Sequence, residues 1–331
     1  MRVLKVSAQE EGQRLDRMLA KYMPLAPRSF FYKMLRKKNI KLNGKKADGS
    51  EKTVQGDEIT LYLAEETIDG FRKKTEPKAE NRQTKNSRGK KMNIPVVYED
   101  SDILLLNKPV GVLSQKADKE DYSLVEWLED YLQTDSSQTF RPGICNRLDR
   151  NTSGLVAAGK SIRGLQWMNQ LFRERDLEKY YLCLVHGAVK EPKKLHGYLK
   201  KDSEKNKVTV IRSPEKGTAE IETEYQPVQV MTWEGEKYTL LKIHLITGKS
   251  HQIRAHLASI GYPVVGDVKY GRRGKAEQKF RLRSQLLHAW QLKLEPVEYL
   301  PQLYWGKCFQ AELPARFRNV LEEMGTDIQG F

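Results

Sequence analysis

The sequence predicts an α+β fold in which a mixed, largely antiparallel sheet follows a smaller N-terminal unit of helices and strands. Near the N-terminus, apolar residues recur at three- and four-residue steps within 15–22 and 28–38, the spacing of amphipathic helices. Farther along, short apolar runs such as 180–185 alternate with helical stretches. From residue 208 onward the runs are separated by turns alone, which favours antiparallel pairing.

The chain has 331 residues, more than one compact core usually holds, so we expect two domains. The composition changes near residues 65 and 92. We therefore expect a small domain over 1–64, a flexible basic linker over 65–92, a large domain over 93–315, and a C-terminal tail over 316–331 with a short helix and a frayed end.

In the small domain, the helix over 15–22 should end at Pro24, and a second helix is expected over about 28–38. Strands at 40–42 and 59–63 should follow, with the tight-turn dipeptide Asn43-Gly44 after the first. In the large domain we expect two helices, over 124–132 and 164–172, and strands over 103–107, 154–158, 180–185, 208–211, 219–225 and 238–245.

The charge balance points to a polyanionic partner. The 58 Lys and Arg residues outnumber the 43 Asp and Glu residues, which gives a formal net charge of +15. The alternative is that the charge serves solubility alone. No run approaches the ~20 apolar residues of a membrane span, and the first residues carry no secretory pattern, so we expect a cytoplasmic protein. The three cysteines are isolated, which argues against a disulfide framework and against a zinc site.

The positive charge is concentrated in two segments. Residues 28–46 contain no acid, whereas an ordinary solvated helix face mixes both signs. We expect this segment to bind the phosphates of a polyanion through its eight basic residues: Arg28, Lys33, Arg36, Lys37, Lys38, Lys41, Lys45 and Lys46. Residues 72–91 hold nine basic and two acidic residues and almost no apolar ones, so the linker is either a plain tether or a source of unspecific phosphate attraction.

One candidate for chemistry is the segment 146–154, which immediately precedes an expected strand. Asp149 lies there between Arg147 and Arg150. The simplest interpretation is a surface ion-pair cluster. However, a turn at the end of a strand commonly displays functional groups, and a neighbouring arginine favours the ionised carboxylate that a nucleophile or base requires.

A second candidate is the segment 245–257. Its Gly-Lys-Ser sequence suggests a phosphate loop, but the glycine required five positions before Gly248 is replaced by Ile243. His251 and His256 are five residues apart and do not share a helix face, which argues against a zinc pair. The remaining structural interpretation buries Ile253 and Leu257 in the core and leaves Arg254 at the surface.

Both domains carry motifs of known families. Five motifs occur in order across about 93–312: Asn107-Lys108-Pro109-Val110-Gly111, Arg147-Leu148-Asp149 with Thr152-Ser153-Gly154, Lys179-Tyr180-Tyr181 with Gly187, Thr247-Gly248 with His251-Gln252-Ile253-Arg254, and Gly266-Asp267 with Tyr270-Gly271. Together they resemble the Rlu-type family of RNA pseudouridine synthases, whose catalytic domain has the α+β fold expected here. Four residues depart from the family pattern, namely Asn146, Asn151, Lys249 and Ser250. Residues 12–64 resemble the S-four-type RNA-binding domain, on the basis of Gly12-Gln13-Arg14-Leu15-Asp16, Arg28-Ser29, Lys41-Leu42-Asn43-Gly44-Lys45 and Gly56-Asp57.

The resemblance implies roles for individual residues. Asp149 would be the essential carboxylate, which attacks ribose, adds to the base or abstracts a ribose proton. Arg254 would pair with it, and Tyr181 would contact the uracil and assist proton removal at carbon 5. The same resemblance implies a substrate pocket formed by Arg147, Leu148 and Ile253, and an RNA contact by Arg150 near the position that the flipped base vacates.

The same resemblance implies an isomerase that needs no cofactor and no metal. Its expected partner is RNA, with large-subunit ribosomal RNA or its assembly intermediate as the first hypothesis, and the protein is expected to be a monomer. Two alternatives stay open at this stage: a pseudouridine synthase acting on transfer or messenger RNA, and a non-catalytic RNA-binding factor in ribosome assembly.

Overall fold

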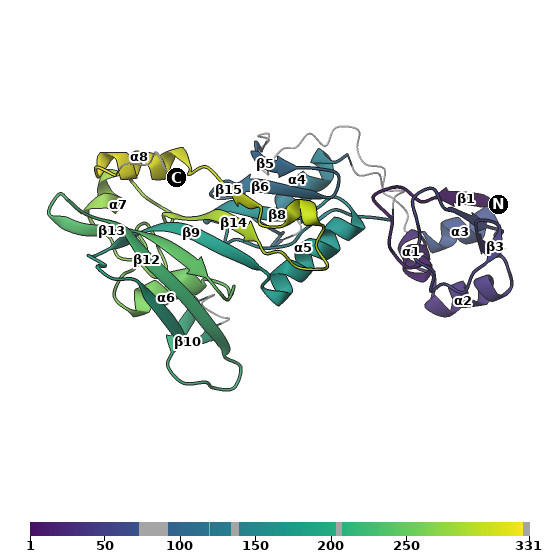
Figure 1. The fold of residues 1–331 in the computed structure, drawn as a ribbon, viewed down its shortest axis with the longest axis horizontal. Coiled ribbons are helices and arrows are strands. Elements are labelled where there is room, and N and C mark those ends of the chain that lie inside the picture. The colour runs from purple at the N-terminus through teal and green to yellow at the C-terminus, as the bar shows by residue number, and fades with distance from the viewer. Residues whose placement is uncertain (73–91, 119, 134–138, 203–206, 327–331) are drawn as a thin grey trace.

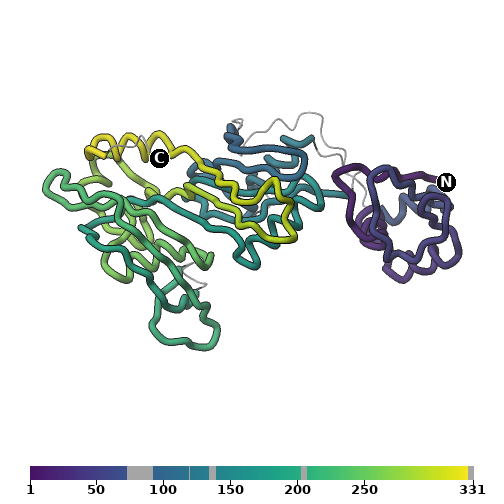
Figure 2. The backbone as a smooth tube through the Cα atoms, viewed as in Figure 1, coloured from purple at the N-terminus to yellow at the C-terminus, as the bar shows by residue number. Residues whose placement is uncertain are grey.

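The computed structural model describes residues 1–72, 92–118, 120–133, 139–202 and 207–326. The N-terminal unit lies at one end of an elongated molecule, and the hairpin of β10 with its neighbouring strands lies at the other (Figures 1 and 2). No helix in the described part of the chain is long and apolar enough to cross a membrane.

The N-terminal unit packs helices on a four-stranded antiparallel sheet. Its strands run in the order β1-β4-β2-β3, and its core includes Leu15, Phe31 and Ile59. The elements are β1 (Arg2–Lys5), α1 (Leu15–Tyr22), α2 (Arg28–Arg36), β2 (Ile40–Leu42), β3 (Lys45–Lys46), β4 (Glu58–Leu61) and α3 (Glu65–Phe71). Both predicted helices are present. Asn43 and Gly44 join β2 to β3 with φ values of 50° and 71°, as a tight hairpin turn requires.

The expected start of the linker at residue 65 is wrong. Residues 65–71 form α3, and Ile68 on this helix is fully buried in the first core. The backbone N–H of Leu25 also donates to the carbonyl of Phe71. These apolar side chains hold the segment against the domain, so the unit extends to Phe71. The rest of the expected linker, 73–91, lies outside the described residues.

The large domain is built on one eleven-stranded sheet. The strand order is β11-β10-β12-β13-β9-β14-β8-β6-β5, with β15 paired to β14 and β7 paired to β8. Only the β14–β8 pair is parallel among the described strands, so the predicted mixed, largely antiparallel sheet is confirmed. The strands are β5 (Val96–Glu99), β6 (Ile103–Lys108), β7 (Gly143–Ile144), β8 (Ser153–Gly159), β9 (Leu177–His186), β10 (Lys193–Asp202), β11 (Lys207–Ile211), β12 (Ala219–Trp233), β13 (Glu236–Leu245), β14 (Leu287–Leu294) and β15 (Cys308–Gln310).

Apolar cores cover both faces of the sheet. Along β6, Leu104 and Leu106 face one core while Ile103 and Leu105 face another, because successive side chains in a strand point to opposite faces. The covering helices are α4 (Leu124–Tyr131), α5 (Ile162–Glu174), α6 (Gln252–Ser259), α7 (Lys275–Lys279), the 3₁₀ turn η1 (Gln302–Tyr304) and α8 (Ala315–Glu323).

The expected C-terminal tail at 316–331 needs a correction as well. Phe317, Val320 and Leu321 on α8 are buried against Leu182 and Leu184 of β9. Their three- and four-residue spacing gives the helix an apolar face, which draws it onto the sheet. The helix therefore belongs to the large domain.

The two domains contact each other directly. The carboxylate of Glu10, only 4% exposed, accepts hydrogen bonds from the backbone N–H and the hydroxyl of Thr139 at 2.8 and 2.6 Å. The N–H of Ile162 donates to the carbonyl of Gln9 at 3.0 Å. These contacts join the N-terminal unit to the start of α5 and to the segment that leads to β7.

Candidate active site

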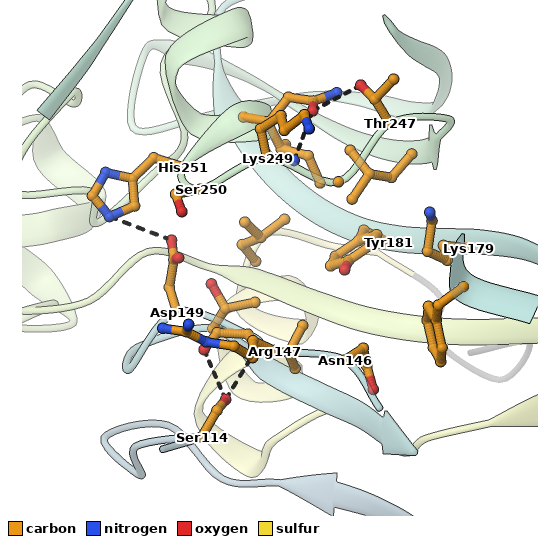
Figure 3. A pocket seen from close by; sticks show the side chains of 18 of the residues that line it. Ser114, Asn146, Arg147, Asp149, Lys179, Tyr181, Thr247, Lys249, Ser250 and His251 are labelled. Atoms are coloured by element: carbon orange, nitrogen blue, oxygen red, sulfur yellow. Dashed lines mark hydrogen bonds and ion pairs between the residues drawn. The ribbon is translucent and has the colours of Figure 1, made fainter. Parts of the chain in front are cut away.

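A pocket of about 670 Å³ brings together three distant segments of the large domain. Residues 145–150 form one wall, 245–254 form another, and Lys179 and Tyr181 on β9 form part of the floor (Figure 3). Seven residues expected to form the site or to contact RNA beside it line this pocket: Arg147, Leu148, Asp149, Arg150, Tyr181, Ile253 and Arg254.

Asp149 lies on a short loop whose backbone is anchored just before this residue. The side chain of Asn146 bridges to β8, donating to the carbonyl of Leu155 at 3.2 Å and accepting from the N–H of Ala157 at 2.8 Å. The N–H of Leu148 donates to the hydroxyl oxygen of Ser114 at 3.1 Å, and that hydroxyl donates to the carbonyl of Leu148 at 2.9 Å. Asn146, which departs from the family pattern, therefore anchors the backbone of this loop to β8.

Arg254 joins two carboxylates in the interior. One guanidinium nitrogen, Nη1, donates to Oδ2 of Asp149 at 2.8 Å. Nε and Nη2 donate to the two oxygens of Asp267 at 2.6 and 2.9 Å. The Arg254 side chain is only 6% exposed and that of Asp267 is fully buried. The interpretation that left Arg254 at the surface is thus wrong, because two buried or half-buried carboxylates compensate its charge.

This network fixes the charges in the site. Burial disfavours ionisation of Asp267, but the hydrogen bonds and charge of Arg254 outweigh it and hold the pKa of Asp267 below its ordinary value. The side chain of Asp149 is 24% exposed. Among the described residues none donates to its second oxygen, Oδ1. Asp149 is therefore bound at one oxygen and open at the other.

Tyr181 presents a neutral ring to the pocket. It is 8% exposed, and burial together with the charge of Asp149 raises the pKa of its hydroxyl. The phenol consequently stays protonated. A protonated tyrosine can pack against a base and donate a hydrogen bond, whereas it is a poor proton acceptor.

Lys108 at the end of β6 holds the chain directly after Asp149. Its ammonium donates to the carbonyls of Pro109, Val112 and Arg150 at 3.1, 2.9 and 3.2 Å. Burial lowers the pKa of Lys108 to about 7, and the charge of Asp149 opposes this shift. Three carbonyl acceptors match the three N–H groups of the charged form, so we assign that form to the folded protein. This role was not predicted, although Lys108 belongs to the first family motif.

The lining of the pocket is strongly cationic. Among the described residues that line it, Asp149 is the one acid, whereas seven are arginines or lysines: Arg147, Arg150, Arg173, Arg175, Lys179, Lys249 and Arg254. Arg150 donates from Nε to the carbonyl of Gly111 at 3.2 Å and is exposed. Burial, with the nearby charge of Arg175, lowers the pKa of Lys179 to about 8. Such a lining suits a polyanion around one carboxylate.

The basic segment of the N-terminal unit is also available for contact. Seven of its eight cations are exposed, and Lys41 is half-buried with its ammonium 5.3 Å from the ring of Tyr62. None of the eight makes an ion pair with any residue in 1–72 or in the other described ranges. Within the same ranges no group of three or more His, Cys, Asp or Glu residues could hold a metal ion.

Comparisons with known proteins agree on one family. A family model described as RNA pseudouridylate synthase matches residues 102–259. An uncharacterized RNA pseudouridine synthase of Aquifex aeolicus is 31% identical over 328 residues, which cover 96% of each chain. Ribosomal large subunit pseudouridine synthase C of Buchnera aphidicola is 30% identical over 339 residues, covering 97% of this chain and 96% of the relative.

A solved structure shares the fold. Human RNA Pseudouridylate Synthase Domain Containing 4 superposes with a TM-score of 0.54 at 21% identity, covering 69% of this chain and 92% of the human one. At that identity the likeness concerns the fold of the large domain.

Proposed function

The chain belongs to the Rlu-type family of RNA pseudouridine synthases, and we propose that it modifies large-subunit ribosomal RNA with Asp149 as its essential carboxylate. The reaction is an isomerisation. The bond between N1 of uracil and C1′ of ribose breaks, a bond between C5 and C1′ forms, C5 loses a proton and N1 gains one. No electrons are exchanged with a partner and no group is added.

The observation that carries the proposal is the state of Asp149. Arg254 donates to its Oδ2 at 2.8 Å, Asp149 lines the pocket, and no described residue donates to its Oδ1. Attack on ribose, addition to the base and abstraction of a ribose proton all require an ionised carboxylate with one free oxygen. The same residue can therefore serve any of these three paths.

Three neighbours are proposed to hold the uracil. Leu148 and Ile253 provide apolar walls, and Tyr181 provides a neutral ring and a hydroxyl donor. Because the phenol is protonated in the protein alone, its help at carbon 5 would require its proton to leave during the reaction. Arg147 and Arg150 are exposed at the rim and are proposed to contact the RNA from which the uridine has flipped.

Large-subunit ribosomal RNA is proposed as the substrate on two grounds. Relatives that align with nearly the whole chain carry ribosomal large subunit in their names. The exposed cations of residues 28–46 offer a second contact region outside the pocket, which suits a large folded RNA. We further propose that residues 1–71 act as the RNA-binding domain that the S-four-type resemblance implies.

Asp149→Asn tests the catalytic assignment. The substrate is ribosomal RNA labelled with [5-³H]uridine, prepared from cells that lack this protein, and product formation is measured as tritium released from carbon 5. The variant should release no tritium above background, while its RNA Kd and urea-unfolding curve match the natural protein. Asp130→Asn on α4, outside the pocket, is the matched control and should keep full activity. Full tritium release by Asp149→Asn would refute the assignment.

The substrate class is tested separately. Pseudouridine is mapped across total RNA from cells with and without the gene. Sites that disappear should lie in large-subunit ribosomal RNA. Loss confined to transfer or messenger RNA would overturn the proposed substrate and leave the catalytic assignment intact.

A further inference from the structure

We propose that His251 and Tyr270 form a hydrogen-bonded pair that positions Asp149. The inference rests on Asp149 being the reactive carboxylate, as proposed above. His251 immediately precedes α6, and Tyr270 lies on the loop that follows Asp267. No role in the site was expected for either residue from the sequence.

The pair is defined by three contacts. The ring nitrogen Nδ1 of His251 is 3.0 Å from the hydroxyl of Tyr270. The other ring nitrogen, Nε2, is 3.9 Å from Oδ2 of Asp149, and Figure 3 shows the ring turned toward that carboxylate. The hydroxyl oxygen of Tyr270 also accepts the backbone N–H of Val208 at 2.9 Å, which ties the pair to β11.

These contacts determine which nitrogen of His251 carries the proton. Since the Tyr270 oxygen already accepts the N–H of Val208, its own hydrogen is free to be donated. Nδ1 of His251 is the hydrogen-bond acceptor that the described residues offer it. In the neutral ring the proton then resides on Nε2, which faces Asp149.

The charged surroundings are consistent with a neutral ring. Asp149 faces His251 from the loop before β8, Arg254 from α6, and Asp267 and Lys269 from the loop that also carries Tyr270. Burial is the largest influence and lowers the pKa of His251; the two carboxylates oppose this shift, and the two cations reinforce it. The ring is thus a neutral donor at physiological pH.

The backbone of His251 supports a functional constraint. Its φ and ψ are 56° and 14°, in the left-handed region that residues other than glycine seldom adopt. Such a conformation costs about 1 kcal/mol, and it is retained where the surrounding structure requires a particular side-chain direction. Here that direction places Nε2 beside Asp149 and Nδ1 beside Tyr270.

The consequence concerns the orientation of the carboxylate. Arg254 and His251 both approach Oδ2, which leaves Oδ1 as the oxygen presented to the pocket. At 3.9 Å the His251 contact is longer than a hydrogen bond. An approach of about 1 Å when RNA binds would complete it, as catalytic hydrogen bonds often tighten in the substrate complex.

Two substitutions of His251 separate the hydrogen bond from mere packing. His251→Leu removes the donor, and kcat with the labelled ribosomal RNA should fall by about tenfold to a hundredfold, the usual effect of losing an orienting partner. The RNA Kd should stay within about twofold, because the substrate contacts are unchanged. His251→Gln can place an amide N–H near the position of Nε2 and should recover most of the loss. The matched control is His196→Leu, since this histidine is exposed on β10 outside the pocket and should leave kcat unchanged.

A pH profile supplies a readout that a packing defect would not move. With one donor to the carboxylate removed, the acid limb of kcat should move to higher pH in His251→Leu and stay in place in His251→Gln. Tyr270→Phe keeps the ring under Arg254 but leaves Nδ1 of His251 without its hydrogen-bond donor, so this variant should also have a lower kcat.

An unchanged kcat in His251→Leu, together with an inactive Asp149→Asn, would overturn this inference alone. Activity in Asp149→Asn would instead overturn the proposed function. Equal losses in the Leu and Gln variants would show a packing role and would also overturn the inference.

Discussion

Replacing Arg254 with lysine tests whether the shape of the guanidinium, and not its charge alone, holds Asp149. Arg254 makes three hydrogen bonds to two carboxylates, at 2.8 Å to Asp149 and at 2.6 and 2.9 Å to Asp267. A lysine keeps the positive charge but has a single nitrogen on a flexible side chain. It cannot reproduce the planar set of N–H donors with which the guanidinium binds both carboxylates. We expect the ammonium to stay with the fully buried Asp267, because an unpaired buried carboxylate costs more than a half-exposed one.

The size of the effect follows from the hydrogen bond to Asp149 that the variant lacks. A hydrogen bond between charged groups contributes about 1.5–3 kcal/mol. Each 1.36 kcal/mol of lost transition-state stabilisation lowers the rate about tenfold, so kcat should fall by roughly 10- to 150-fold. The RNA Kd should change little, since Arg254 is buried beneath Asp149.

The assay is tritium release at saturating labelled ribosomal RNA, combined with RNA binding and urea unfolding. Arg163→Lys is the matched control, because this arginine pairs with Asp102 outside the pocket. Arg254→Ala is less informative, since it also leaves Asp267 without its partner, a change that costs about 3–5 kcal/mol of stability. If Arg254→Lys lost stability but kept the natural kcat, the bond to Asp149 would be structural and the reasoning would fail.

Two further predictions concern RNA binding and stability. Lys37→Glu combined with Lys38→Glu should weaken binding of ribosomal RNA and reduce the slope of log Kd against log salt by about one for each phosphate that the variant no longer binds, at unchanged kcat. A salt slope equal to that of the natural protein would contradict a phosphate-binding role for this face. Burial lowers the pKa of His288 to about 4 from an ordinary 6.5, so below pH 6.5 the unfolded chain binds a proton that the folded one refuses, and this group should lower the free energy of unfolding by about 3 kcal/mol between pH 6.5 and 4. The buried His256 should add a fall in the same direction, since burial lowers its pKa to about 4 as well. Urea unfolding across that range measures the total fall, which should be about 3 kcal/mol smaller in His288→Gln; an equally steep fall in the variant would contradict the assignment to His288.

Sequence patterns predicted the parts of the fold that local spacing controls. The helix expected over 28–38 is present as Arg28–Arg36, and the strand expected over 180–185 lies within β9. The pocket residues also assemble as the order of the family motifs implies. Hydrophobic periodicity and turn dipeptides are local properties of the chain, so they can be recognised in the sequence without the structure.

Other features depend on contacts between distant residues. The burial of Arg254 could not be derived from its own neighbours, because Asp149 is 105 residues away in the sequence. The strand β14 was not expected either, and its parallel pairing with β8 brings His288 beside Ser153. The position of Lys108 is similar, since its carbonyl partners include Arg150, 42 residues later.

The Thr152-Ser153-Gly154 sequence after Asp149 has a physical explanation in those same contacts. Thr152 accepts from the amide of Gln285 at 3.1 Å, and the hydroxyl of Ser153 is 2.8 Å from Nδ1 of the buried His288. Gly154 has a φ of 112°, and a Cβ there would lie 2.1 Å from the carbonyl oxygen of Ala289. Only glycine therefore lets the backbone of β8 approach β14 so closely.

These three residues, together with the bond from Lys108 to the carbonyl of Arg150, fix the chain from 150 to 154 against the sheet. The loop of Asp149 is thus held against the sheet by buried contacts, among them the ammonium of Lys108, while Arg254 on α6 and His251 directly before α6 reach its carboxylate. A carboxylate anchored in this way can meet an RNA phosphate backbone without being displaced, because its orientation does not depend on the exposed cations that we propose to bind RNA. Substitutions of the exposed cations should accordingly act on RNA binding, whereas substitutions on α6 should act on turnover.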